Sequence, residues 1–481
     1  MLSNKSDSNE CNCWGERFLW TDLHQSAAQL HPMTFTYDSL ADECLHRLDE
    51  IAPDTAPAQP DKTEGKPKRD LYALLRDHAD DDPKLKQLWT EANTVPEWVH
   101  WEQIRRGQEV FYRYGLPILN VLNYESLLGG MGAGRVVETL ARTGGFSSYV
   151  ARRRMFETLQ FVLQVTSSMD SIKPNGDGHA SSVRVRFLHA TVRQRILELE
   201  KQNPGYFDVE KFGVPVNDLD CIGTINTFST SVIWLGLPRQ GIWLREQEIE
   251  DYIALWRLIA HYLGTPTEPF ESKAKGRAMM DSLLASQINP TDMGKILAKN
   301  IVLSLENTAP AYASKEFMEA MARRLNGDEL SDRLDIPQSS LYYRALIFGY
   351  CMFVMTFSYT VRLFPPLDRR FIAIRRSRYY KIATDKDTGL GGETMFEFKH
   401  VPKISRTTRL GKRRTSKPTK QGIETLAHMG LFGTVAAVAI LCSWIVFLVQ
   451  HADFSQTFLR IENEMKLDSL SKSFAFLGRF A

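Results

Sequence analysis

The chain has 481 residues, of which 43% are hydrophobic and 24% are charged, and its formal net charge is +2. This composition provides enough apolar material for a large core and excludes a disordered, collagen-like or disulfide-scaffold protein. The six cysteines form no CxxC pair, which argues against a zinc ribbon or a secreted disulfide framework and favours thiols in a reducing compartment.

Residues 1–70 are predicted to be a mostly flexible N-terminal region. The chain begins with a polar stretch that lacks the apolar segment of a cleavable signal peptide. A short helical pattern over residues 37–51 is followed by a stretch with four prolines and mixed charge, which is typical of a flexible linker.

Residues 71–361 are predicted to form one large all-α domain. Helical periodicity runs through almost the whole segment, and no repeat or run of alternating strands is found. Ser147 and Asn217 are expected to cap helices, and Gly264 is expected to end one. The glycine-rich stretch 126–146 follows no predicted strand and contains no Gly-Lys-Ser/Thr, so turns and close helix packing explain it better than a nucleotide loop.

Three segments are predicted after this domain: a basic juxtamembrane linker (362–426), a transmembrane helix (427–450) and a C-terminal tail (451–481). From 362 to 420, seventeen Lys and Arg outnumber five Asp and Glu by twelve, which favours phosphate-bearing partners or an anionic membrane surface. Residues 431–449 are nineteen uncharged residues, about enough to cross a bilayer. Basic residues concentrate before the span, so the large domain is expected in the cytoplasm.

A second uncharged run, residues 345–361, leaves an alternative open. If it also crossed the membrane, the large domain would lie on the opposite side. Its length and aromatic content fit a buried core helix slightly better, and a single span is the leading prediction.

His189 is the first candidate for chemistry, because it falls on the apolar stripe of the helix predicted over residues 183–201. A buried imidazole needs a partner for each ring nitrogen. It can be a core histidine bonded to a carbonyl, or it can be a ligand of a metal or a haem iron. His261 is the second histidine on an apolar face.

Charged and polar neighbours of this stripe have two interpretations each. Arg186 and Arg193 flank His189 on its helix and could meet haem propionates or lie at the surface. Arg154 and Thr158 are four residues apart and share a helix face, where they could orient a bound oxygen species or simply snorkel and pair with acids.

Glu138 and Arg142 are also four residues apart, as in an ordinary ion pair or a base held beside a substrate. Other metal and catalytic motifs carry little weight. Two Glu-x-x-His matches occur, at Glu43 and Glu97, about as many as chance predicts, and no HExxH, Gly-x-Ser-x-Gly or haem-thiolate signature is present. Because the basic segment runs into the predicted anchor, nucleic acid is not expected as a partner.

Several ordered motifs between about Val95 and Gly264 resemble one family, that of the ER-bound oxygenase of mycophenolic acid biosynthesis (MpaB) and the latex-clearing rubber oxygenases. They are VPEWVHWEQIRRGQEVFYRYG, SLLGGMGAGRVVETLARTGGF, ARRRMFETLQ, VRVRFLHATVR, FGVPVNDLDCIGTINTFSTSV and YIALWRLIAHYLG. The likeness is greatest to fungal members.

The resemblance implies an all-helical, globin-like core that holds b-type haem and uses O2 as co-substrate. It places the proximal iron ligand at His189, the Arg-x-x-x-Thr pair near the haem at Arg154 and Thr158, and an assisting glutamate at Glu138. Rubber oxygenases have a lysine just before the threonine, whereas this chain has Glu157, so the distal coordination differs from theirs.

The expected function is a membrane-anchored oxygenase that cleaves a C=C bond of an apolar, isoprenoid-like chain, and the family likeness suggests the endoplasmic reticulum. A non-catalytic, membrane-anchored lipid-binding protein is the alternative. A third possibility is an interaction module that uses its basic segment against anionic lipid. The oligomeric state is not predicted.

Overall fold

The computed structural model describes residues 9–53, 69–396, 409–411 and 422–448. A two-stranded antiparallel hairpin, β1 (Glu10–Cys13) and β2 (Glu16–Leu19), opens this part of the chain, with Glu10 opposite Leu19. Its turn has positive φ angles at Trp14 and Gly15, as a tight two-residue hairpin requires. The Trp14 indole N–H donates to the Leu284 carbonyl at 3.1 Å and ties the hairpin to the helical domain.

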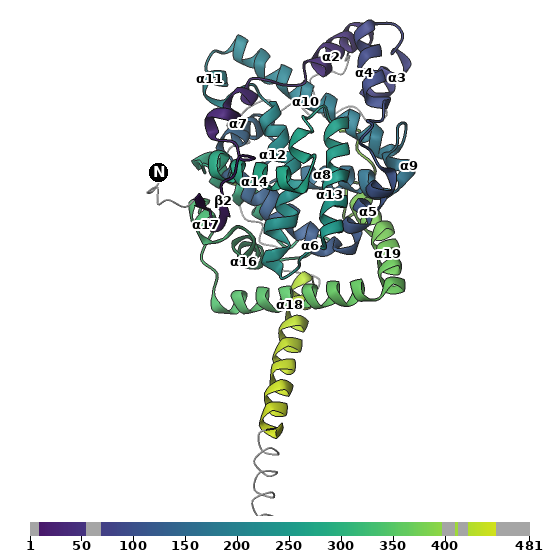
Figure 1. Ribbon diagram of the computed structural model, residues 1–481. Coiled ribbons are helices and arrows are strands. Elements are labelled where there is room, and N and C mark those ends of the chain that lie inside the picture. Colours follow the sequence, from purple (N-terminus) through teal and green to yellow (C-terminus); the bar gives the residue numbers. More distant parts are fainter. Residues whose placement is uncertain (1–8, 54–68, 397–408, 412–421, 449–481) are drawn as a thin grey trace, which may run out of the picture.

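An N-terminal helical layer covers one side of the domain (Figure 1). It consists of α2 (Ser39–Ile51), α3 (Leu71–Asp77) and α4 (Pro83–Asn93), which bury a small core of their own against α10 (Asp177–Gln202). Residues 9–53 are therefore folded, unlike the flexible region that was predicted. The predicted proline-rich linker lies mostly outside the described residues.

The main body is a helical bundle around a larger core, and the expectation of an all-α fold is confirmed. Two short segments, η2 (Val121–Leu128) and η4 (Val232–Gly236), are π-helical. The longer helices of the bundle are α5 (Trp101–Arg113), α6 (Gly115–Asn120), α7 (Gly134–Thr143), α8 (Ala151–Ser167), α12 (Asp218–Phe228), α13 (Glu246–Tyr262), α14 (Lys273–Gln287), α15 (Asp292–Leu305), α16 (Lys315–Asn326) and α17 (Asp328–Arg333).

Short helical turns connect these elements. They are α1 (Ala27–Leu30), η1 (His31–Thr34), η3 (Gly129–Gly132), α9 (Met169–Ile172), α11 (Val209–Phe212), η5 (Pro238–Gln240) and η6 (Glu268–Phe270). Several glycines of the 126–146 stretch lie in tight packing, as predicted: a Cβ added at Gly134 would come within 2.7 Å of the Asn289 carbonyl oxygen, although Gly130 has open space around it.

The pair α5 and α13 forms the centre of the bundle. Gly107 permits their close approach, because a Cβ there would lie 2.3 Å from the Asp251 carbonyl oxygen. The Arg106 guanidinium joins the buried Asp251 carboxylate through two hydrogen bonds of 2.7 and 2.8 Å. Both a small residue and a bidentate ion pair therefore hold these helices together.

The helix boundaries follow the sequence signals in part. Asn217 caps α12 by accepting from the Asp220 amide at 2.9 Å, and Gly264 follows α13 with a φ of +68°. The prediction that Ser147 caps a helix is wrong. Residues 147–150 form a turn, and α8 begins only at Ala151, with no side-chain cap.

The base of the domain is formed by α18 (Leu341–Leu363) and α19 (Pro365–Thr384), which meet at Phe364 (Figure 1). Most of the first half of the predicted basic linker is thus helix α19, packed against α5 and α8. The helix was missed because its many arginines obscure the apolar face. Residues 403–420, on which the predicted orientation depends, lie almost entirely outside the described residues.

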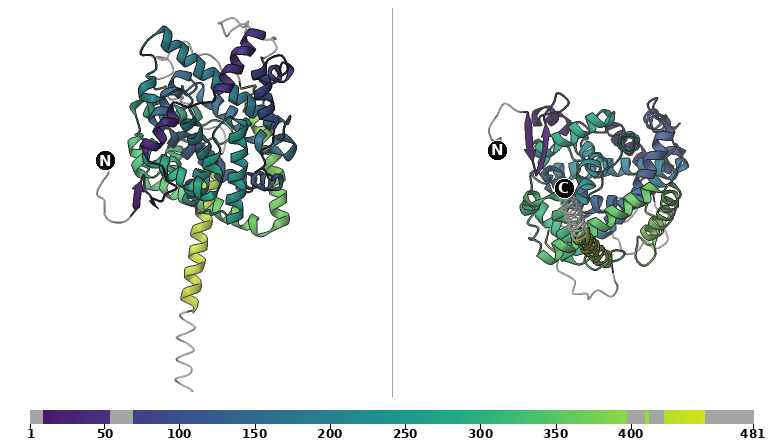
Figure 2. Two further views of the ribbon diagram at one scale, coloured as in Figure 1. Left: turned by 45° about the horizontal axis from the view of Figure 1, so that its top comes forward. Right: turned by 60° about the horizontal axis from the view of Figure 1, so that its bottom comes forward.

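The C-terminal helix, Ile423–Leu448, leaves the base of the domain as a separate rod (Figures 1 and 2). It is long and apolar enough to cross a bilayer, and none of its most apolar window is buried. By contrast, 44% of the corresponding window of α18 is buried, and this helix lies across the base of the domain. The tail beyond residue 448 lies outside the described residues.

Candidate functional site

Helix α10 positions His189 between the two cores. Val183, Phe187 and Ala190 pack into the small N-terminal core, whereas Leu188 and Val192 pack into the main core. His189 lies on the same side as the second pair, as the apolar stripe predicted. The sequence did not reveal the second apolar face, because the two faces together hide the periodicity of either one.

The His189 imidazole lies deep in the domain but is only half-buried, so part of its ring is accessible. Among the residues that the structure describes, neither ring nitrogen has a hydrogen-bond or ion-pair partner. Burial lowers the pKa of His189 to about 4; Arg193 and Arg154 lower this pKa further, and Asp38 opposes them. The ring is therefore neutral at physiological pH, with a lone pair free to bind a ligand.

Arg186 has acidic partners in the N-terminal layer. It is buried, donates to the Asp38 carboxylate at 2.5 and 2.9 Å, and lies 2.8 Å from Glu91. A Cβ at Gly264 would come within 2.5 Å of the Asp38 carboxylate, so the loop after α13 closes over this pair. These contacts favour a role for Arg186 in holding α2 and α4 against α10.

Arg193 is also buried and multiply bonded. It pairs with Asp42, donates to the Pro215 and Val216 carbonyl oxygens at 3.2 and 3.0 Å, and lies over the Tyr37 ring. The partners of both arginines were missed from the sequence. Asp38 could have been recognised as a helix N-cap, but nothing in the sequence indicates that it faces α10.

Helix α8 supplies the Arg154 and Thr158 pair. The Thr158 hydroxyl donates to the Arg154 carbonyl oxygen at 3.1 Å, so the two residues are neighbours on one helix face, as predicted. Arg154 packs against Gly145, whose missing Cβ would lie 3.1 Å from the arginine Nε. Because Arg154 also affects the pKa of His189, the structure brings these two predicted site residues near one another.

Glu157, which replaces the lysine of the rubber oxygenases, is buried and accepts from both neighbouring arginines. Arg153 donates to it at 3.2 Å and Arg154 at 3.0 Å. The carboxylate therefore fixes the Arg154 guanidinium from its own helix. This positioning role of Glu157 was not anticipated from the sequence.

Glu138 lies on α7 and pairs with Arg142, one turn further along the same helix. Arg142 in turn donates to the Tyr206 carbonyl oxygen at 3.0 Å, beyond the end of α10. The predicted ion pair is present. Within the described part of the chain, Glu138 makes no ion pair with a residue of α8 or α10.

Half-buried apolar side chains lie near His189 and Thr158 on their two helices. Val185 lies one turn before His189, and Met155 and Leu159 flank Thr158; all three are half-buried at the edge of the main core. The described residues contain no group of three or more His, Cys, Asp or Glu that could hold a metal ion. A haem iron needs one axial side chain because the porphyrin supplies its other ligands, so His189 fits haem better than a protein-only metal site.

Comparisons with known proteins bear on this site. The chain matches the family model described as ER-bound oxygenase mpaB/B′/rubber oxygenase, catalytic domain, over residues 121–356, which include every predicted site residue. The rubber oxygenase of Streptomyces sp. (strain K30) is 21% identical over 273 residues, 54% of this chain and 63% of that protein. Aurantioclavine synthase cnsA of Penicillium expansum is 61% identical over 33 residues, 7% of either chain. The chain thus spans less than two thirds of the length of these relatives.

A solved structure shares the fold. Latex clearing protein LCP in its closed state matches with a TM-score of 0.52 and 15% sequence identity, covering 76% of this chain and 95% of that chain. At this identity the likeness establishes the helical architecture alone.

Proposed function

Because this chain belongs to the family of the ER-bound oxygenase mpaB/B′ and rubber oxygenase catalytic domains, we propose that it is a membrane-anchored, haem b-dependent oxygenase. Its substrate is an apolar chain of prenyl type, and it uses O2 to cleave a C=C bond. Each cleavage consumes one O2 and leaves one carbonyl oxygen on each fragment.

The observation that carries this proposal is the imidazole of His189, whose ring nitrogens have no partner among the described residues. A histidine inside a core normally bonds through its ring nitrogens, because an unsatisfied buried polar group is costly. Here the neutral ring is accessible, and its helix neighbours Leu188 and Val192 belong to the main core. His189 is therefore the residue that would hold the haem, and bound haem iron would supply the activation of O2.

Three further residues would take part in that chemistry. Arg154, held by Glu157, presents a fixed positive charge where negative charge would develop on oxygen during the reaction. Thr158 is exposed on the same face and can donate its hydroxyl proton to a bound molecule in place of the Arg154 carbonyl. Glu138, held by Arg142, is the carboxylate available to accept a proton if the substrate reaches α7.

Membrane anchoring matches the proposed substrate class. A prenyl-type chain partitions into a bilayer, and the C-terminal helix would hold the domain at that surface. We assign the domain to the cytoplasmic side of the endoplasmic reticulum, on the basis of the basic residues before the span and the description of the family.

Spectroscopy of the detergent-solubilised full-length chain tests the proposal. The purified protein should show a Soret band, yield haem b as its pyridine haemochrome, and consume O2 when a prenyl-type substrate is added. A folded protein without haem would overturn the proposal. A haem-loaded protein that consumes no O2 with any of a panel of prenyl substrates would instead favour the non-catalytic lipid-binding alternative.

Arg154→Gln tests the role of the α8 face. We expect turnover to fall by about a hundredfold, on the order of 2.7 kcal/mol of lost transition-state stabilisation, with an unchanged haem content. Arg195→Gln is the matched control, because Arg195 lies on α10 in an exposed ion pair with Glu198. Full activity in Arg154→Gln would make this face structural.

A further inference from the structure

Helix α18 is apolar on both its sides. Its inner face packs on the domain through buried residues such as Leu346, Tyr350 and Val354. Its outer face nevertheless carries large exposed apolar side chains: Leu341 is 82% exposed, Phe348 53% and Leu363 69%. A helix that is apolar all round and lies on a surface is expected to meet an apolar environment there.

The position of the C-terminal helix indicates that this apolar environment is a membrane. Its glycine at position 430 packs onto Gly349 of α18, where an added Cβ would lie 2.1 Å from the Gly349 carbonyl oxygen. From Phe432 onward its large apolar side chains are exposed. The helix therefore leaves the domain directly across α18, and a membrane crossed by it would meet the exposed face of α18 (Figures 1 and 2).

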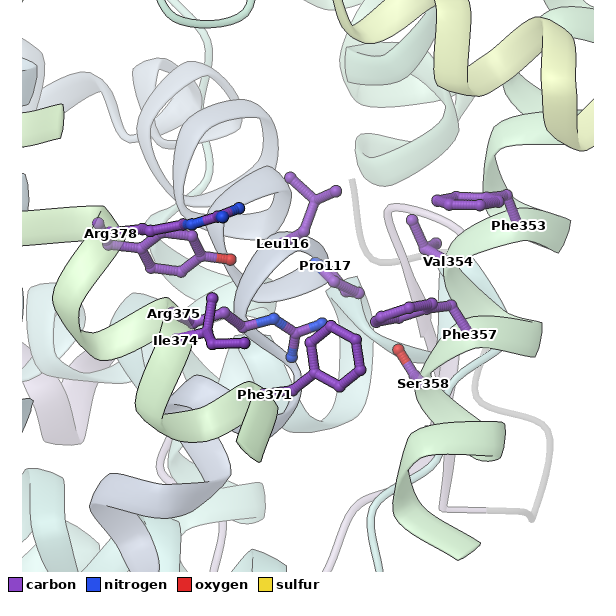
Figure 3. A pocket seen from close by; sticks show the side chains of 11 residues that line it. Leu116, Pro117, Phe353, Val354, Phe357, Ser358, Phe371, Ile374, Arg375 and Arg378 are labelled. Carbon is purple, nitrogen blue, oxygen red and sulfur yellow. The ribbon is translucent and has the colours of Figure 1, made fainter. Parts of the chain in front are cut away.

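An apolar cavity of about 310 Å³ opens between α18 and α19 at this base (Figure 3). Its walls are mostly apolar side chains: Leu116 and Pro117 from α6, Phe353 and Phe357 from α18, and Phe371 and Ile374 from α19. The volume is at the lower end of the range for ligand pockets. His189 and the other predicted site residues do not line it.

Two arginines at this cavity have no carboxylate partner in the part of the chain that the structure describes. Arg375 donates to the Tyr112 and Arg113 carbonyl oxygens at 2.7 and 2.6 Å, while the nearest acid, Asp368, is bonded to Arg113. Burial lowers the pKa of Arg375, and Tyr379 and Asp368 oppose this only in part. Arg378 is exposed, and no described residue pairs with it.

We propose that this cavity binds one hydrocarbon chain of an anionic phospholipid from the adjoining leaflet, with the lipid phosphate at Arg378 and Arg375. The apolar walls accept the chain, and a phosphate supplies the anion that neither arginine finds among the described residues. The inference rests on the membrane anchoring in the proposed function but not on haem or on catalysis.

Lipid binding to the full-length chain in detergent tests the proposal. The probes are fluorescent phosphatidylglycerol and diacylglycerol with identical acyl chains, titrated separately, so that only the phosphate headgroup differs. Arg378→Gln should weaken phosphatidylglycerol binding by about fivefold and leave diacylglycerol, which has no phosphate, unchanged, as expected for the loss of one exposed charge-assisted contact. Arg369→Gln is the matched control, because Arg369 is exposed on the same helix, without a partner among the described residues, and does not line the cavity.

A second variant tests the cavity itself. Ile374 is half-buried at its wall, and Ile374→Trp should fill it and weaken binding of both lipids by about tenfold. Equal affinity of the native chain for both lipids, or equal effects of Arg378→Gln and Arg369→Gln, would overturn the headgroup assignment. Undiminished binding in a folded Ile374→Trp protein would overturn the cavity assignment.

The haem content of the same samples separates the two proposals. His189→Ala should bind phosphatidylglycerol like the native chain, because His189 does not line the cavity. Loss of lipid selectivity with an intact Soret band overturns this inference alone, whereas a haem-free protein with intact lipid selectivity overturns the proposed function alone.

Discussion

Two histidines on helix α10, His179 and His189, differ in whether their ring nitrogens have hydrogen-bond partners. The His179 side chain is fully buried; its Nε2 lies 2.8 Å from the Ala92 carbonyl oxygen, and its Nδ1 accepts from the Asn175 amide at 3.2 Å. His189, ten residues later, has no such partner among the described residues. The difference teaches that depth in the core does not distinguish the two histidines, whereas the availability of a ring nitrogen for a ligand does.

The largest expected effect concerns haem. His189→Ala should lose nearly all bound haem, because the side chain proposed to bind the iron is removed, whereas His179→Ala should retain it. Haem per polypeptide, measured as pyridine haemochrome, checks both variants. Normal haem content in His189→Ala would move the ligand elsewhere, and His261, whose Nε2 is buried and unpartnered, would be examined next.

The next largest effect concerns the ion pair between Arg186 and Asp38, which holds α10 against the N-terminal layer. Arg186→Met should destabilise the fold by about 3–5 kcal/mol, because Asp38 is then left next to the core without its cation. Denaturant unfolding of the solubilised chain measures this loss. The exposed pair of Arg195 and Glu198 provides the control, and Arg195→Gln should cost less than about 1 kcal/mol. A similar cost for both variants would show that the buried network does not hold the helix.

Much of the local arrangement around His189 and Arg154 could be predicted from the sequence. The apolar stripe placed His189 on the core side of its helix, and spacing placed Thr158 beside Arg154. These features depend on residues within a few helical turns, where geometry follows directly from periodicity.

The contacts between distant parts of the chain could be seen only in the folded structure. The partners of His179 lie at Ala92, in a separate helix, and at Asn175 before α10, so the sequence could not distinguish its ring from that of His189. Likewise, Asp38 is 148 residues from Arg186 in the chain. Helix α19 was taken for a linker because its apolar contacts with α5 and α8 lie among arginines whose burial depends on tertiary packing.

A smaller effect concerns the stability of the fold, to which we expect His179 to contribute more than His189. In haem-free protein, His179→Ala should cost about 2 kcal/mol, because the Ala92 carbonyl and the Asn175 amide lose a buried partner. His189→Ala should cost less than about 1 kcal/mol, because no hydrogen bond is broken. Unfolding curves of the two apo variants measure the difference. A larger loss in His189→Ala would indicate that this ring has a structural partner.

The smallest expected effect is a pH dependence that belongs to His179. Burial lowers the pKa of His179, and the nearby His261 adds to this, while the hydrogen bond to Ala92 opposes it. Below about pH 6.5, His179 takes up a proton more readily in the unfolded chain than in the folded one. The contribution of His179 to the free energy of unfolding therefore falls as the pH falls, and it is constant above that value. His179→Gln should reduce the slope by up to about 1.4 kcal/mol per pH unit between pH 6.5 and 5. Glutamine does not titrate, so an unchanged slope of the free energy of unfolding against pH would assign the acid sensitivity to other groups. It would also show that the hydrogen bonds of His179 hold its ring equally well in both charge states.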